Sequence, residues 1–301
     1  MNPQVSRRDI LKWSAAGAAA LVSPTILKAP AFAKDSAGKQ DKKRIPIGLQ
    51  LYSVRDVAGK DFDGALKQVA EMGFEGVEFA GYGKYAKDPE GLRKLLDDLK
   101  LKAAGTHIGA GSFVGDALKK TIDFHKIIGC HFLIVPGDGR YTDPEKSKEY
   151  AEFMNKTAEA LKAEGLSTGH HNHTGEFKKT EGDKTYFDLF AERTSKDVIL
   201  QQDMGHTMAA NVDPIAIVKK YPGRIKTTHI KNRPAKASGK KPFVGEDNFD
   251  WKAYVTACYE VGGNEWFTLE QEEYPDGKSS MECTKISLDG FKAVLKELGK
   301  S

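Results

Sequence analysis

Three histidines lie within four positions near the middle of the chain, in the segment Leu166–Phe177, and Glu176 follows them closely. Side chains alternate along a β-strand, so His171 and His173 project to the same face if this segment ends a strand. Neutral imidazole is the commonest metal-ligating side chain in proteins. The segment therefore predicts part of a metal site, whose other ligands must come from elsewhere in the chain.

Three further potential ligands, Asp203, His229 and Glu270, follow later apolar runs. Each has an ordinary alternative role, as a helix N-cap, a hydrogen-bonded core residue and a surface charge respectively. Their occurrence at consecutive strand ends, spaced by one strand and one helix, favours a shared role. Mixed imidazole and carboxylate ligation suits Mn²⁺, Zn²⁺, Co²⁺ or Fe²⁺ better than Ca²⁺ or Mg²⁺. We therefore predict one divalent ion held by His171, Asp203, His229 and Glu270.

Short apolar runs alternate with helical patterns eight times along the chain, which predicts parallel strands connected by helices. The expected strands span residues 45–51, 74–79, 101–108, 131–136, 166–172, 198–203, 224–230 and 265–270. The expected helices span residues 62–72, 90–99, 114–128, 144–164, 186–193, 214–221, 251–261 and 279–298. Four of these helices are followed by a glycine at the position of a C-terminal cap: Gly73, Gly129, Gly165 and Gly262.

Eight strand–helix units of this kind predict a single (β/α)8 TIM barrel. The competing α/β architecture, a doubly wound open sheet, is disfavoured because no G-x-G-x-x-G motif follows the first strand. In a TIM barrel, the residues that follow the strands gather at the C-terminal mouth, where active sites lie. The fold class therefore predicts that the four candidate ligands converge.

The N-terminus has the features of a twin-arginine export signal. Arg7 and Arg8 precede an apolar stretch, Trp13–Val22, and an A-x-A sequence ends at Ala33. An amphipathic N-terminal helix is the alternative interpretation. The apolar stretch is shorter than the ~20 residues that a membrane-spanning helix needs, so we expect no membrane anchor. We predict a signal over residues 1–33 that is cleaved after Ala33, a flexible leader over 34–44, a barrel domain over 45–299, and a periplasmic location.

Composition limits the classes of partner. The chain of 301 residues has a net charge of +4, and most of this excess lies in the predicted signal. The remaining barrel is nearly neutral and has no basic stripe, which argues against nucleic-acid binding. The chain has three cysteines, Cys130, Cys258 and Cys283. This number is small and odd, so we expect no disulfide framework. We expect a small-molecule partner, and the oligomeric state is left open.

The motifs at the strand ends resemble those of the xylose isomerase-like TIM-barrel superfamily, the sugar phosphate isomerases/epimerases, over roughly Pro46–Leu298. The matching segments are IGLQLYSVR from Ile47, GFEGVE from Gly73, GHHNH from Gly169, DMGH from Asp203, the segment from Arg224 to Asn232, and LEQ from Leu269. The resemblance implies one divalent ion held by a Glu, an Asp, a His and a second Glu from strands 5 to 8. Asp203, His229 and Glu270 match this set, whereas His171 stands where relatives have the first Glu.

The resemblance implies a metal-dependent isomerase or epimerase that removes a proton next to the carbonyl of a keto-sugar and proceeds through an enediolate. In that chemistry two metal-bound glutamates exchange the proton, and His171 cannot be both a ligand and a base. The histidine-rich pattern resembles inosose dehydratases and 3-keto-glycoside lyases or hydrolases more closely, so a lyase is the alternative. A catalytically inactive sugar-binding barrel is the non-enzymatic alternative.

Further polar residues at the strand ends receive roles from this hypothesis. The predicted catalytic residues are Glu270, His173, Glu176, His206 and Lys231, and the predicted substrate contacts are His107, Asn172 and Gln50. Among these, Lys231 is expected to pair with an oxyanion. The long loop over residues 232–248 is either a lid or a solvated connection. No glycine-rich phosphate cradle is visible, so we predict a carbohydrate substrate without a phosphate site.

Overall fold

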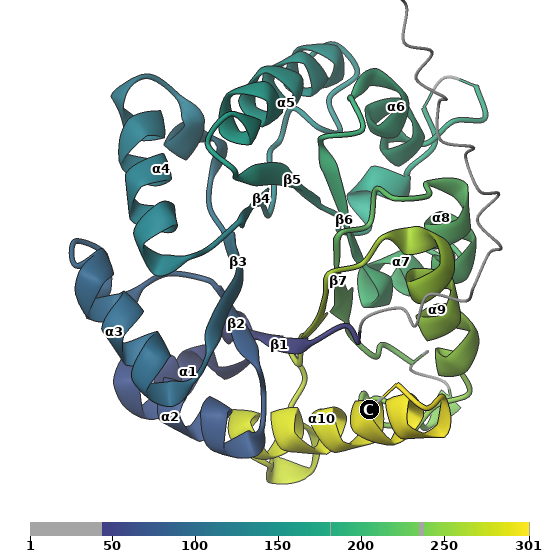
Figure 1. Cartoon of the computed structure of the whole chain (residues 1–301). Helices are drawn as coiled ribbons and strands as arrows, with labels where there is room; N and C mark the ends of the chain where they lie inside the picture. The colour runs from purple at the N-terminus through teal and green to yellow at the C-terminus, as the bar shows by residue number, and fades with distance from the viewer. Residues whose placement is uncertain (1–43, 181, 235–237, 301) are drawn as a thin grey trace, which may run out of the picture. The chain divides into compact units, whose positions relative to one another are not determined.

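The computed structural model describes residues 44–180, 182–234 and 238–300 (Figure 1). The predicted signal and residues 34–43 of the predicted leader lie outside the described residues. Eight parallel strands form a closed barrel in chain order, and helices surround it. The first and last strands close the barrel, with Ile47 opposite Phe267. The predicted (β/α)8 TIM barrel is confirmed.

The strands are β1 Ile47–Gln50, β2 Gly76–Phe79, β3 Lys102–His107, β4 Phe132–Val135, β5 Ser167–His171, β6 Ile199–Asp203, β7 Thr227–Ile230 and β8 Trp266–Leu269. Each is shorter than the apolar run that predicts it. The flanking residues Leu166, Val198 and Ile225 are buried but lie outside the strands. Hydrophobicity reports burial rather than strand pairing, so the apolar runs overestimate strand length.

The main helices are α2 Phe62–Met72, α3 Pro89–Leu99, α4 Asp116–Ile128, α5 Ser147–Lys162, α6 Tyr186–Arg193, α8 Pro214–Lys220, α9 Trp251–Ala257 and α10 Ser280–Glu297. Two short helices, α1 Arg55–Ala58 and α7 Met204–Ala209, are not predicted from the sequence. Helix α7 begins directly after β6 without a loop, because Asp203 is both the last strand residue and the helix N-cap.

Two of the four predicted glycine caps are confirmed, because Gly73 and Gly129 are left-handed C-caps. Gly165 has a positive φ but lies two residues beyond Ala163, the C-cap of α5. The prediction for Gly262 is wrong by one residue. Helix α9 continues into a π-helical turn, Cys258–Gly262, and the left-handed cap is Gly263. A π-turn inserts one extra residue, which moves the end of the helix along the chain.

The barrel interior has an apolar floor below a polar layer. The floor consists of Ala104, Phe132, Ile134, Ile199 and Trp266, most of them at or near the starts of their strands. The larger apolar core lies between the strands and the surrounding helices. Toward the strand ends the interior becomes polar and remains buried. Buried polar side chains need hydrogen-bond or metal partners inside the protein. The polar layer at the strand ends is therefore the candidate location for a functional site.

None of the helices in the described part of the chain combines the length and apolarity needed to span a bilayer.

Candidate metal centre

The four predicted ligands, His171, Asp203, His229 and Glu270, meet at the C-terminal mouth of the barrel. All four are buried, and one ligand atom from each lies within 4.8 Å of the others. His171 and Asp203 are the last residues of β5 and β6, and Glu270 directly follows β8. The register pairs Asp203 with His229 on the neighbouring strand β7. Parallel pairing thus brings residues distant in sequence to one level of the barrel.

Asp203 uses its two carboxylate oxygens differently. Oδ1 accepts a 2.7 Å hydrogen bond from the backbone N–H of His206, which caps α7. Oδ2 is buried and has no hydrogen-bond partner. It lies 3.9 Å from His171 Nε2 and 3.8 Å from His229 Nδ1. The ammonium of Lys231 also lies 3.4 Å from Oδ2 and partly balances its charge. A buried carboxylate oxygen that accepts no hydrogen bond and faces two imidazoles can still ligate a cation, so this atom fits a metal site.

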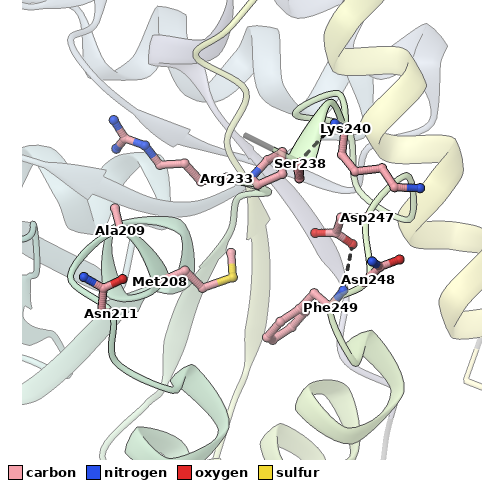
Figure 2. Close-up of a pocket in the computed structure, with 10 residues that line it drawn as sticks. Met208, Ala209, Asn211, Arg233, Ser238, Lys240, Asp247, Asn248 and Phe249 are labelled. Atoms are coloured by element: carbon pink, nitrogen blue, oxygen red, sulfur yellow. Dashed lines mark hydrogen bonds between the residues drawn. The ribbon is translucent and has the colours of Figure 1, made fainter. Parts of the chain in front are cut away.

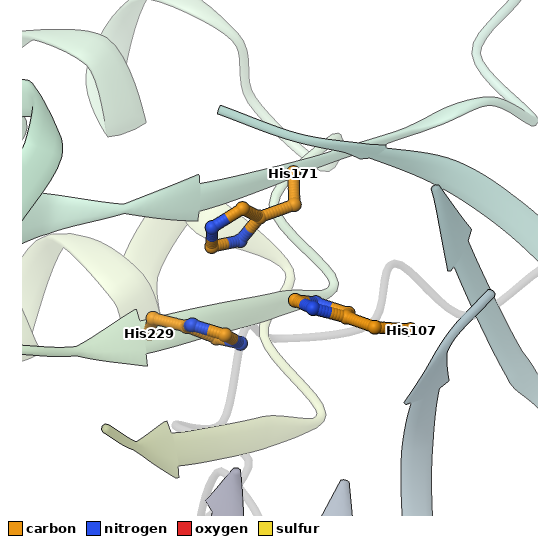
Figure 3. Close-up of side chains that lie close together, drawn as sticks. All are labelled: His107, His171 and His229. Atoms are coloured by element: carbon orange, nitrogen blue, oxygen red, sulfur yellow. The ribbon is translucent and has the colours of Figure 1, made fainter. Parts of the chain in front are cut away.

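His229 lies between two carboxylates. Its Nδ1 is 2.9 Å from Glu270 Oε2 and its Nε2 is 2.5 Å from Glu78 Oε1. Burial lowers the pKa of His229, but the charges of Glu78 and Glu270 and the hydrogen bonds to them outweigh burial and raise it to about 10. The side chain of His171 points toward the same space, and the ring of His107 is stacked on that of His229 (Figure 3).

His171 has the opposite electrostatic character. Burial lowers its pKa well below the ordinary value, and the neighbouring His229 and His107 lower it further. Its ring is therefore neutral near pH 7, which is the form that ligates metals.

Two buried residues of this layer, Glu78 and Gln201, are missed by the sequence analysis. Glu78 is fully buried in β2 and accepts hydrogen bonds of 2.7 Å from both Gln50 Nε2 and Gln201 Nε2. Burial raises its pKa, but His107 and His229 outweigh burial and lower it to about 2. A carboxylate inside the run Gly76–Phe79 is the signal that could have identified it, because an ionised residue in a buried strand needs partners.

Two of the four proposed ligands, His171 and Glu270, line a cavity of about 360 Å³ at the mouth, within the size range of small-molecule pockets, and Asp203 and His229 are buried behind them. It is lined by Tyr52, Ala80, His107, Pro136, His171, His173, His206, Lys231, Glu270 and Glu272. The structure thus brings five predicted catalytic or substrate-binding residues to the ligand cluster: His107, His173, His206, Lys231 and Glu270. Their roles remain predictions.

Lys231 places a positive charge beside the ligands. Its Nζ lies 3.2 Å from Glu270 Oε2 and 3.4 Å from Asp203 Oδ2, and it also pairs with Glu272. Burial lowers the pKa of Lys231, but the three carboxylates outweigh burial and raise it. The ammonium also lies 3.3 Å from His206 Nε2. Burial lowers the pKa of His206, so a neutral imidazole and an ammonium are in contact.

Three predicted site residues lie behind the mouth and do not line this cavity. Glu176 accepts a 2.9 Å hydrogen bond from the backbone N–H of His173. Asn172 Oδ1 accepts one of 3.1 Å from the backbone N–H of Asp203. Gln50 is fully buried, with its amide bound to Glu78. These contacts hold the strand ends in position, and the predicted catalytic role of Glu176 and the predicted substrate contacts of Asn172 and Gln50 stay predictions.

The described parts of the strand-7 loop are partly anchored. Asn232 Nδ2 donates a 2.6 Å hydrogen bond to the carbonyl of Phe243, and Phe243 is buried. A second cavity of about 520 Å³ lies between this loop and α7, with Met208, Arg233 and Phe249 among its lining residues (Figure 2). Residues 235–237 of this loop lie outside the described residues. A lid function for this loop stays a prediction.

Family models match both parts of the chain. The xylose isomerase-like TIM barrel model matches residues 66–293. A model of the twin-arginine translocation signal matches residues 4–24 and confirms the predicted signal. The match supports export, whereas the cleavage site and the periplasmic location stay predictions.

Characterised proteins resemble the chain at low identity. The inosose dehydratase of Clostridium beijerinckii is 27% identical over 212 residues, which cover 62% of this chain and 69% of that protein. The structure of a sugar phosphate isomerase/epimerase from Parabacteroides distasonis matches with a TM-score of 0.69 and 21% identity, and covers 84% of this chain and 97% of that one. The structure of the IOLI protein with a bound zinc atom matches with a TM-score of 0.64 and 13% identity, over 84% and 99% of the two chains. These structural matches support the fold.

Proposed function

The chain belongs to the xylose isomerase-like TIM barrel family, and on this premise we propose that it is a divalent-metal-dependent enzyme acting on a keto-sugar or keto-cyclitol. The proposed reaction begins with removal of a proton from the carbon next to the carbonyl. The observation that carries the proposal is the convergence of four ligand side chains, including the Asp203 Oδ2 that accepts no hydrogen bond, beside a cavity of small-molecule size that His171 and Glu270 line.

The residues that would hold the ion are His171, Asp203, His229 and Glu270. Two imidazoles and two carboxylates suit Mn²⁺, Zn²⁺, Co²⁺ or Fe²⁺, and the zinc atom of the similar IOLI structure is consistent with this choice. When bound, such a cation supplies Lewis acidity that polarises a carbonyl and makes the neighbouring C–H group more acidic.

The protein supplies proton transfer through the groups in contact at the mouth. We assign the base to His206, because burial keeps its imidazole neutral and it lines the cavity. Lys231 stays protonated between its carboxylates, so it is suited to stabilise a developing oxyanion or to donate a proton to a leaving group. Glu270 contacts both the proposed proton donor Lys231 and the proposed ligand His229, and therefore holds the ammonium next to the ligand cluster.

The ligand set favours elimination over epimerisation. Epimerisation needs a proton donor on the face opposite to the base, and the resemblance assigns these two tasks to two glutamate ligands. Here the first of those positions is His171, so Glu270 is the one glutamate in the cluster. Elimination needs a single base together with an acid for the β-substituent, and His206 and Lys231 provide that pair. The similar curated protein is named a dehydratase, which agrees with this choice.

Epimerisation is the second candidate, because a structurally similar protein is named a sugar phosphate isomerase/epimerase. Incubation of the metal-loaded protein in D2O with an inosose, a 3-keto-glucoside and free ketohexoses separates the two reactions. Elimination releases water or the aglycone and leaves an unsaturated ketone, which mass spectrometry and NMR detect. Epimerisation returns a ketose of the same mass apart from one incorporated deuterium. Binding without turnover for every substrate would instead support the inactive sugar-binding barrel.

The variant Glu270→Gln tests the residues directly. We expect weaker metal binding and a fall in turnover of roughly 10²–10⁴-fold, the usual range for impaired acid–base catalysis, because Glu270 contacts the proposed proton donor Lys231. The matched control is Glu265→Gln, an exposed glutamate just before β8 at the opposite end of the strand. Full turnover by Glu270→Gln with its ion retained would refute the role assigned to Glu270.

A further inference from the structure

We propose that Gln201 is a positioning residue that fixes which nitrogen of His171 faces the metal site, and that Glu78 fixes Gln201 in turn. The inference rests on the proposed metal centre. Gln201 lies in β6, two residues before Asp203, and it is fully buried. It is not one of the proposed ligands, and it is not among the residues that line the cavity.

The amide of Gln201 is fully satisfied within the barrel. Its Nε2 donates hydrogen bonds of 2.7 Å to Glu78 Oε2 and 2.6 Å to Thr227 Oγ1. Its Oε1 is 2.7 Å from His107 Nε2 and 3.1 Å from His171 Nδ1. An amide has two N–H donors and two acceptor lone pairs, so each of its four positions has one partner.

The orientation of this amide is determined by Glu78. Rotation of the amide by half a turn would bring the carbonyl oxygen of Gln201 against a Glu78 carboxylate oxygen, and two acceptors cannot bond to each other. The orientation in which Nε2 faces Glu78 is therefore the one the network allows. The amide oxygen must then face the two imidazoles, and both must present an N–H to it.

The consequence for His171 is a single tautomer. Its Nδ1 carries the hydrogen and donates to Gln201, so its Nε2 keeps a free lone pair. That Nε2 is the atom 3.9 Å from Asp203 Oδ2, on the side where the ligand atoms converge. Ligating histidines commonly donate their second N–H to a neighbouring acceptor, which orients the ring and sets the tautomer. Gln201 fills that role for His171.

The same carboxylate orients the second imidazole ligand. Glu78 Oε1 lies 2.5 Å from His229 Nε2, so a hydrogen on Nε2 leaves Nδ1 for the metal site. His229 Nδ1 is the atom near Asp203 Oδ2 and Glu270 Oε2. Glu78 therefore orients one ligand directly and the other through Gln201. Figure 3 shows the three rings close together; Gln201 contacts those of His107 and His171, and Glu78 contacts that of His229.

A histidine at position 171, where the family resemblance implies a glutamate, explains why an orienting hydrogen bond is needed. A carboxylate can ligate through either oxygen without a change of protonation. An imidazole has two different nitrogens, and only the unprotonated one can ligate. Without an acceptor at Nδ1, the ring would populate both tautomers and would ligate in only a fraction of the molecules. A fixed acceptor removes this loss of affinity.

The test compares Gln201→Met with the matched control Gln202→Met. Gln202 is the next residue of β6 and is equally buried, but its amide bonds Pro214 and Tyr254 on the outer face of the strand. Full-length protein labelled with ¹⁵N-histidine gives the tautomer of each ring by NMR after removal of metal with a chelator. Calorimetric titration with ZnCl2 and MnCl2 gives the metal affinity of the same proteins.

In the wild-type protein we expect His171 to carry its hydrogen on Nδ1. In Gln201→Met we expect mixed tautomers at His171 and an affinity lower by about 10–100-fold. Gln202→Met should retain the wild-type tautomer and affinity even if it melts at a lower temperature.

Three results would overturn different parts of this reasoning. A wild-type His171 protonated on Nε2 overturns the tautomer assignment, and this holds even if Gln201→Met fails to fold. An unchanged tautomer and affinity in a folded Gln201→Met protein overturns the role of Gln201 alone. A wild-type protein that binds neither ion overturns the metal centre itself, and with it the premise of this inference.

Discussion

The substitution Asp203→Asn separates the two functions of this residue, because only one of its oxygens caps helix α7. Asparagine is as good an N-cap as aspartate, so its Oδ1 can still accept the hydrogen bond from His206 N. The other oxygen, Oδ2, is the unpartnered atom that faces His171 and His229. In the variant an amide nitrogen replaces it, and an amide N–H group does not ligate a cation.

The expected magnitude follows from binding linkage. An ion at one hundred times its dissociation constant stabilises the folded state by about 2.7 kcal/mol. In a domain of this size each kcal/mol raises the melting temperature by roughly 2–4 °C, so the metal should raise it by about 5–11 °C. In Asp203→Asn this metal-dependent rise should nearly vanish. The variant keeps the helix cap but loses the contact between Oδ2 and Lys231, so the quantity to compare is the metal-dependent rise in each protein, not the melting temperature in chelator.

The assay is thermal unfolding followed by circular dichroism, with ZnCl2 or MnCl2 and with EDTA. The control is Asp250→Asn, which changes an N-cap aspartate of helix α9 that accepts a 2.9 Å hydrogen bond from Ala253 N, away from the ligand cluster. This control should keep the full metal-dependent rise. A full rise in Asp203→Asn would mean that Oδ2 does not bind the ion, and the proposed centre would have to be abandoned.

Three further outcomes test other parts of the molecule. Burial raises the pKa of Asp188, but hydrogen bonds from Lys220, Tyr221 and Thr185 outweigh burial and lower it to about 2. The ionised Asp188 therefore stabilises the folded state above the ordinary pKa near 4, and this stabilisation is lost as the pH falls toward 2. The stability of Asp188→Asn, followed by acid unfolding, should lack this loss between about pH 4 and pH 2. In Gly169→Ala the new Cβ would lie 2.2 Å from the carbonyl oxygen of Ile199, so calorimetry should find a loss of about 3 kcal/mol or more in the free energy of unfolding. The control is an alanine at position 139, whose Cβ meets nothing within 4 Å and should leave that free energy unchanged. Mass spectrometry of the exported protein should find Lys34 as its first residue, and an intact N-terminus on exported protein would contradict the cleavage prediction.

The ligand cluster could be predicted from the sequence because its residues stand at the ends of apolar runs. His171, Asp203 and Glu270 each mark the point where a run becomes polar, and the barrel brings such points together. The convergence of these residues follows from the barrel fold alone and does not require knowledge of the register of the strands.

Glu78 and Gln201 could not be predicted in the same way, because they lie within strands rather than at their ends. Both faces of these strands are buried, so alternation of hydrophobicity gives no sign of which side chains face the axis. The neighbouring residues Gln201 and Gln202 illustrate the difficulty. They are chemically identical, yet one bonds the imidazoles inside the barrel and the other bonds Tyr254 outside it.

The charge of the site connects these observations. A histidine in the first ligand position removes one negative charge from the set that the family resemblance implies, and leaves Asp203 and Glu270 as the anionic ligands. Glu78, which lies in a segment that resembles the family, adds a buried negative charge in direct contact with His229. Because it accepts hydrogen bonds from His229 and Gln201, it cannot also turn outward to act on a substrate. In the proposed function, the buried carboxylates still attract a divalent ion, whereas one of the two glutamates that would act on opposite faces of a sugar is absent. The same histidine that we propose Gln201 to orient is therefore the reason that we favour elimination.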